Sequence, residues 1–212
     1  MFYISKAARF YVMPCILLFS LFFPGLVFAS PADQSDPLTI IQSGTQKALE
    51  ILHESENGQG PTLKQRKDEI LKLVDHYFNF DEMAKSALGH PWKEQTPQKR
   101  QEFVGLFKQL LFNTYVDRLQ NYTGHKERVS YDSQQISGDY ALVKTHVLFQ
   151  GNDNVTLDYR LHRKDNKWKV YDVTVEGISL VVNYRSQFSS ILANESFDSL
   201  LQKLRQKVQQ TS

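Results

Sequence analysis

The chain has 212 residues with 25 basic and 23 acidic side chains, a formal net charge of +2, and one cysteine. The chain is nearly neutral and has no cluster of Lys and Arg, which disfavours nucleic-acid binding because that binding depends on displacing counterions. The same charge balance disfavours strong electrostatic adhesion to an anionic membrane. The length suits one domain, which at this size buries about 70% of its unfolded surface.

Residues 1–29 predict a secretory signal peptide. Two basic residues near the start precede an apolar stretch over 12–23, and small residues lead to a cleavage site after Ala29. An uncleaved anchor is the alternative, but the stretch contains a proline and is short for a span of about 20 residues. Cys15 lies inside the stretch, not after it as in a lipoprotein. We expect one soluble domain over 30–212, with no cysteine and 23 residues of each charge.

Four segments that follow show the apolar spacing of amphipathic helices. We expect helices over 38–52, 63–78 and 81–88, the last ended by Gly89 and Pro91. A Thr-Pro pair at 96–97 then opens a long helix that we extend to about residue 122. Its apolar residues leave only a narrow polar strip, so this helix must be covered on more than one side.

From residue 126 the apolar period changes from 3.6 to 2, which predicts antiparallel strands with one buried face. We count four strands, with turns at 151–153 and 164–166: 128–133, 141–149, 155–161 and 168–176. Gly177 leads into a helix with apolar residues from 180 to 191, and a last helix runs over 197–208. Helices, a contiguous meander and further helices predict an α+β domain.

Residues with catalytic or metal-binding spacing are scarce. The six histidines contain no HExxH arrangement and no pair three or four residues apart, and the chain has no nucleophile elbow, P-loop or dinucleotide fingerprint. Asp172 and Glu176 would lie roughly 13 Å apart on a regular strand, whereas paired glycosidase carboxylates need about 5 to 9.5 Å. We therefore expect no enzyme activity, no metal site and no cofactor, and structural roles for both carboxylates, such as accepting backbone hydrogen bonds or pairing with Arg185.

The remaining signal is the abundance of apolar and aromatic side chains on one sheet face and on the helices that can cover it. Such a sheet either closes completely into a core with its helices or encloses a pocket. Periodicity alone does not separate these two outcomes.

Two stretches carry a resemblance to a known family. The first, residues 168–188, reads WKVYDVTVEGISLVVNYRSQF, and the second, residues 80–89, reads FDEMAKSALG and is followed by Trp92, the Thr-Pro pair and FNTY at 112–115. In these motifs and in the order of its helices the chain resembles the MlaC family of periplasmic phospholipid carriers, also called toluene-tolerance auxiliary proteins. A hopanoid-associated branch of that family is similar, so the lipid class is less specific than the fold.

The resemblance implies helices packed on a curved antiparallel sheet around an apolar cavity that takes the acyl tails of a glycerophospholipid. It also implies a periplasmic monomer with phospholipid as cargo, shuttling between an outer-membrane lipoprotein–porin complex and the inner-membrane Mla ABC transporter and so maintaining outer-membrane lipid asymmetry. The alternatives are a carrier of another lipid such as hopanoid, a periplasmic lipid hydrolase, and a small-molecule binding subunit of an importer.

Combining the resemblance with the face assignments gives a set of expected lipid-binding side chains on the long helix, the strands and the helix after them. They are Phe107, Leu111, Tyr115, Val143, Val147, Leu157, Tyr159, Val173, Val175, Tyr184 and Phe188. Residues 183–185 are expected to form the framework that joins the sheet to the following helix.

Overall fold

The computed structural model describes residues 36–53, 61–119, 128–148 and 154–210. These ranges contain six α-helices, one 3-10 helix and a five-stranded antiparallel sheet, which confirms the predicted α+β class. The predicted signal peptide, the turn at 151–153 and the predicted end of the long helix at 120–122 lie outside the described residues. No helix within the described ranges is long and apolar enough to cross a membrane.

The helices before the sheet follow the predicted pattern closely. They are α1 (Pro37–His53), α2 (Leu63–Tyr77), α3 (Phe80–Leu88), the 3-10 helix η1 (His90–Glu94) and α4 (Pro97–Leu119). Thr62 and Gln65 form a capping box at the start of α2, and the Asn79 side chain accepts a hydrogen bond from the Glu82 N–H at the start of α3. Short polar side chains therefore set where these two helices begin.

The sheet is a meander in the order β1-β2-β3-β4-β5. Its strands are β1 (Arg128–Ser137), β2 (Tyr140–Leu148), β3 (Asn154–Lys164), β4 (Lys167–Val175) and β5 (Ile178–Ser179). Asp165 and Asn166 join β3 to β4 with φ of 50° and 60°, as a two-residue hairpin with primed turn geometry requires. The register shifts between Tyr131 and Ser133 and between Arg160 and Leu161, and such bulges increase the local twist.

The prediction of four strands was wrong by one. Ile178 and Ser179 form β5, which pairs with the end of β4 after a turn in which Glu176 and Gly177 have φ of 49° and 79°. A strand of two residues is too short to show an alternating pattern, so only the turn geometry reveals it. Helices α5 (Leu180–Leu192) and α6 (Phe197–Gln210) follow.

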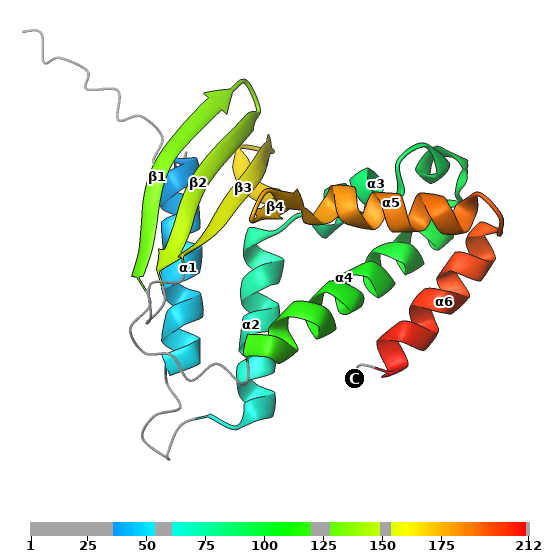
Figure 1. Ribbon diagram of the computed structural model, residues 1–212, viewed down its shortest axis with the longest axis horizontal. Coiled ribbons are helices and arrows are strands. Elements are labelled where there is room, and N and C mark those ends of the chain that lie inside the picture. Colours follow the sequence, from blue (N-terminus) through cyan, green and yellow to red (C-terminus); the bar gives the residue numbers. More distant parts are fainter. Residues whose placement is uncertain (1–35, 54–60, 120–127, 149–153, 211–212) are drawn as a thin grey trace, which may run out of the picture. The chain divides into compact units, whose positions relative to one another are not determined.

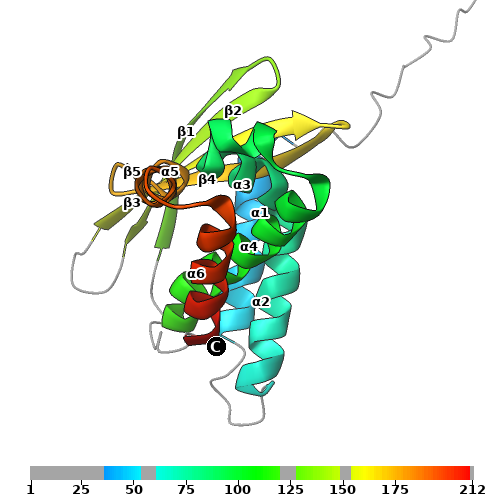
Figure 2. The ribbon, with the colours of Figure 1, turned by 90° about the vertical axis from the view of Figure 1, so that its right-hand side faces the viewer.

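Two apolar clusters hold the described chain together. One lies among α3, α4, α5 and α6 and contains the fully buried Phe103 and Phe107, and the other packs Ile41 of α1 against β2, β3 and β4. Figure 1 shows α1 against the sheet and α4 between α2 and α6, and Figure 2 shows α4 and α6 side by side. Helix α4 contacts α2, α3 and α6, which confirms that a helix apolar nearly all round is covered on several sides.

Candidate functional site

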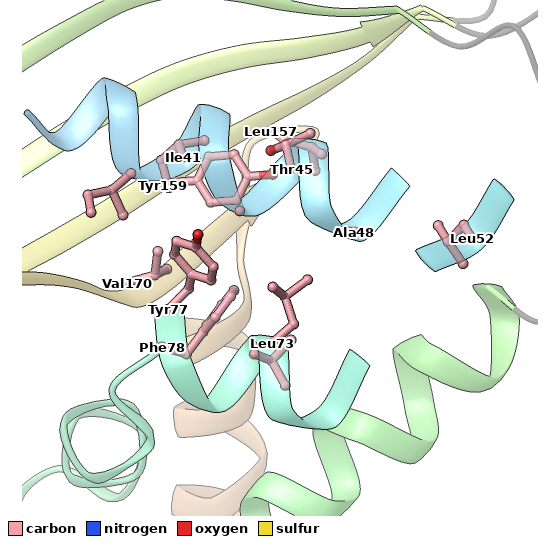
Figure 3. Close-up of a pocket in the computed structure, with 13 residues that line it drawn as sticks. Ile41, Thr45, Ala48, Leu52, Leu73, Tyr77, Phe78, Leu157, Tyr159 and Val170 are labelled. Atoms are coloured by element: carbon pink, nitrogen blue, oxygen red, sulfur yellow. The ribbon is translucent and has the colours of Figure 1, made fainter. Parts of the chain in front are cut away.

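Two apolar hollows lie between the helices and the inner face of the sheet. The first, here called the α1 hollow, has a volume of about 330 Å³ and is bounded by α1, α2, β3 and β4 (Figure 3). The second, the α4 hollow, has a volume of about 360 Å³ and is bounded chiefly by α2, α3, α4, β3 and β4. Both volumes fall at the lower end of the range of about 300–1,000 Å³ for ligand pockets.

The two hollows are adjacent because four residues line both. The shared residues are Ala48 of α1, Val74 of α2, Phe78 directly after α2, and Tyr159 of β3. The wall that separates the hollows is thus made of side chains, and the small Ala48 contributes only a methyl group to it.

The α1–α2 pair forms the outer wall of the α1 hollow. The two helices approach closely at Gly44, where an added Cβ would lie 3.3 Å from Cδ1 of Tyr77. Phe78 is fixed at the end of α2 because it bridges to Val170 of β4, and the following Asn79 N–H donates to the Val170 carbonyl at 2.8 Å. The backbone after α2 is therefore attached to β4 at the floor of the hollow.

Tyr159 lies on β3 and faces Thr45 of α1 (Figure 3). Burial and, to a lesser extent, the neighbouring Tyr131 raise the pKa of the Tyr159 hydroxyl to about 12, although a hydrogen bond with the Thr45 side chain acts in the opposite direction. The hydroxyl is thus neutral at physiological pH, and it joins α1 to the sheet without placing a charge in the apolar space.

The structure divides the expected lipid-binding side chains into two groups. One group lines the hollows: Leu157 and Tyr159 line the α1 hollow, and Leu111, Tyr115, Tyr159, Val173 and Val175 line the α4 hollow. Leu111 and Val173 are buried, and Tyr115 is 36% exposed. These side chains come from α4, β3 and β4, and they line two adjacent hollows.

Most of the other group lies in the packed core. Phe107 packs edge-to-face against Tyr184 and Phe188, with ring centroids 5.1 Å and 5.6 Å apart, in the cluster among α3 to α6. Val143 is fully buried between α1 and the sheet, and Val147 is half-buried on β2. None of these five lines the α1 or the α4 hollow. The apolar faces of the four buried residues are covered by other protein side chains, which periodicity does not distinguish from a pocket wall.

The sequence prediction did not include the residues that α1 and α2 contribute. On α1 the stripe Ile41, Thr45, Ala48 and Leu52 lines the α1 hollow, and on α2 Leu73, Val74 and Tyr77 do so. The signal was present, since the α1 residues recur at helical spacing and become smaller in the middle of the helix. Small side chains on an apolar stripe leave space that larger ones would fill.

The two carboxylates singled out in the sequence have structural partners. Asp172 is 4% exposed, and its oxygens accept hydrogen bonds from the Ser179 hydroxyl at 2.6 Å and from the Val181 N–H at 3.1 Å. Glu176 accepts from the backbone N–H and the hydroxyl of Thr156, and these two hydrogen bonds lower the pKa of its carboxyl. The predicted role as backbone acceptors is confirmed.

The predicted pairing with Arg185 does not occur, because the Arg185 guanidinium donates to the Ser86 carbonyl at 2.7 Å. This hydrogen bond joins α5 to α3, consistent with a framework role for that residue. Within the described residues no group of three or more His, Cys, Asp and Glu side chains is arranged to hold a metal ion.

The geometry defines an α+β domain with apolar hollows between its helices and a curved antiparallel sheet. A family model described as "MlaC protein" matches residues 42–206, and the chain belongs to this family. The resemblance seen in the sequence is thereby confirmed.

Two relatives support the same assignment. The chain is 22% identical over 192 residues to the intermembrane phospholipid transport system binding protein MlaC of Haemophilus influenzae, which covers 87% of this chain and 88% of that protein. It also resembles the solved structure of a phospholipid-binding protein from Ralstonia solanacearum in complex with a phospholipid. That likeness has a TM-score of 0.74 and 25% identity, and it covers 84% of this chain and 99% of the other.

Proposed function

We propose that this chain carries phospholipid through the periplasm and holds the acyl tails in the α1 and α4 hollows. The observation that carries the proposal is the lining of the two adjacent hollows, which is apolar except for Thr45, the tyrosines and one charged residue, Lys108. The Ralstonia relative was solved with a phospholipid, and the Haemophilus relative is a phospholipid transport binding protein.

The free energy of burial supports a carrier of this kind. Each methylene removed from water gains about 0.8 kcal/mol, so two long acyl chains gain on the order of 20 kcal/mol. Uncatalysed passage of a lipid through water is negligible at that cost. A carrier must offer a comparable apolar surface, and it must release the lipid only where a partner protein offers a second apolar surface. Such a transfer requires direct contact between the two proteins and no bond cleavage.

The proposal extends to the route of transport. As a member of the MlaC family with a predicted signal peptide, the mature chain would act as a periplasmic monomer. It would exchange lipid with an outer-membrane lipoprotein–porin complex and with the inner-membrane Mla ABC transporter, and thereby maintain outer-membrane lipid asymmetry. The name of the Haemophilus protein, an intermembrane transport system component, supports this assignment.

Native mass spectrometry of gently purified protein tests the proposal directly. We expect a bound mass of several hundred daltons that tandem fragmentation resolves into phospholipids. A hopanoid mass would assign the chain to another lipid class, and a polar metabolite would contradict the lipid proposal. Incubation of the protein with phospholipid vesicles, followed by lipid analysis, tests the hydrolase alternative, for which we expect no released fatty acid.

A pair of charged substitutions tests where the tails lie. Leu157 and Val175 are register partners on β3 and β4 and line different hollows, so L157E and V175E together place carboxylates in both. The matched control carries I136E and V182E, which replace side chains that are 53% and 58% exposed. We expect lipid to be lost from the first variant and retained by the control. Equal lipid content in both folded variants would contradict the assignment of the hollows.

A further inference from the structure

A third hollow, here called the charged groove, adjoins the α4 hollow and has a very different lining. Its volume is about 870 Å³, and basic and acidic side chains from α2, α3, α4 and the β3–β4 hairpin line it. Phe78, Phe80 and Lys108 line both the charged groove and the α4 hollow. An apolar space and a polar space therefore meet at these three side chains, as the two ends of an amphiphile require.

Lys108 of α4 has its charged end at this junction. Its ammonium group lies 2.5 Å from Oδ1 and 2.6 Å from Oδ2 of Asp75, and 5.5 Å from the centre of the Phe80 ring. It is also the one charged residue among those that line the α4 hollow. The aliphatic part of the side chain covers the apolar space while the charge faces the groove.

A second ammonium group approaches the same aspartate. Nζ of Lys169 on β4 donates to the backbone carbonyl of Asp75 at 3.4 Å. Two lysines from different elements thus contact Asp75, Lys108 at the carboxylate and Lys169 at the backbone carbonyl. The acidic Glu82 of the groove is paired with Lys85 at 3.3 Å, which leaves it less able to compete for Lys108.

We propose that Lys108 and Lys169 bind the phosphate group of the lipid whose acyl tails occupy the α4 hollow, and that the Asp75 carboxylate competes with that phosphate for Lys108. The inference rests on the proposed function, because it requires the tails to lie in the hollow. An ammonium group binds phosphate by charge-assisted hydrogen bonds, as it binds the Asp75 carboxylate. Lys108 lines both the α4 hollow and the charged groove, so its ammonium group lies where the polar end of such a lipid would leave the apolar space.

The alternative is that Lys108 only pairs with Asp75 and covers the hollow. The two hypotheses predict different directions for the effect of D75N on phospholipid uptake. If Asp75 competes with phosphate, D75N releases Lys108 and increases phospholipid uptake, whereas K108M decreases it. If the pair is only structural, both substitutions act in the same direction.

The experiment measures lipid uptake by delipidated protein from vesicles that contain dioleoylphosphatidylglycerol and dioleoylglycerol in equal amounts. The two lipids share their acyl chains, and only the first carries a phosphate. We expect K108M to lower phosphatidylglycerol uptake about tenfold, the effect of losing one charge-assisted hydrogen bond, and to leave dioleoylglycerol uptake unchanged. D75N should raise phosphatidylglycerol uptake, and K169M should lower it less than K108M.

The matched control uses another ion pair of the same helix. Lys99 of α4 lies 2.6 Å from Asp198 of α6, and neither residue lines any of the three hollows described here. We expect K99M and D198N to leave the uptake of both lipids unchanged. Circular dichroism establishes whether each variant is folded. If K108M does not fold, the phosphatidylglycerol uptake of D75N decides between phosphate binding and a purely structural ion pair.

Three outcomes would overturn the phosphate assignment. In the first, folded D75N takes up as much phosphatidylglycerol as the wild type. In the second, K108M loses both lipids equally. In the third, inorganic phosphate binds saturably and through Lys108, but phospholipid uptake does not depend on Lys108. The last outcome would assign the groove to free phosphate. A wild-type protein that takes up neither lipid would instead refute the proposed carrier function, so the two failures are distinguishable.

Discussion

Replacing Asp172 with alanine should destabilise the junction between the sheet and α5. The Asp172 carboxylate is buried, accepts hydrogen bonds from the Ser179 hydroxyl and the Val181 N–H, and lies 3.9 Å from Nε of Arg160. Ser179 is the N-cap of α5, and Leu180 between the two donors lines the α4 hollow. One side chain on β4 therefore positions both the start of a helix and a wall of the candidate site.

The size of the effect follows from these contacts. Each hydrogen bond to a charged group is worth about 1.5–3 kcal/mol, and the alanine variant leaves the buried Val181 N–H without an acceptor. Loss of negative charge near a helix N-terminus adds up to about 1 kcal/mol. We expect D172A to lower the free energy of unfolding by about 3 kcal/mol, which for a domain of this size lowers Tm by about 6–12 °C.

Thermal and urea unfolding followed by circular dichroism measure this effect. D172N keeps one oxygen acceptor for the Val181 N–H and should lose less stability than D172A. D139A is a suitable control, because Asp139 forms an ion pair with Arg163 at 3.0 Å but its side chain is 62% exposed. If D172A melted at the wild-type temperature, or if D139A were equally destabilising, Asp172 would not anchor α5.

Three further predictions follow from single residues. The Thr156 hydrogen bonds hold the pKa of the Glu176 carboxyl below its ordinary value of 4.5. The contribution of this carboxylate to stability is therefore present above pH 4.5 and is lost as the pH falls through the lowered pKa. E176Q should reduce this acid sensitivity when unfolding is measured as a function of pH. Because a Cβ at Gly44 would already meet Tyr77 at 3.3 Å, G44L should destabilise the protein by about 1–3 kcal/mol and reduce bound lipid, as measured by melting and lipid analysis. Phe107 is 1% exposed in the helical core, so F107A should lower the free energy of unfolding in urea by about 3–5 kcal/mol. F107L keeps an apolar side chain and should retain lipid. A folded F107L variant that specifically lost lipid would contradict the placement of Phe107 in the core.

Much of the fold was predictable because local signals agreed with the tertiary structure. The capping Thr96 and the following proline marked the start of α4, and the period-2 alternation marked β2 and β3. The exception was β5, whose two residues pair with β4 only because Glu176 and Gly177 adopt positive φ. Such pairing depends on backbone conformation that no apolar pattern encodes.

The candidate site was only partly predictable for a related reason. Of the side chains expected on the apolar faces of α4, β3 and β4, Leu111, Tyr159 and Val175 line the hollows. Phe107 and Tyr184 have the same apolar character, but α5 and α6 cover them. Whether an apolar face meets another helix or a space depends on the distance between elements, which is a property of their packing.

The sequence by itself determined the α+β class, the order of the elements and the family motif, because each of these depends on residue types at short separation along the chain. Only the tertiary structure decided that α1 and α2 close the apolar space and that Lys108 and Lys169 both contact Asp75 where an apolar hollow joins a charged groove. Those three residues come from α4, α2 and β4, and contacts between elements so far apart in the chain arise only when the whole domain packs.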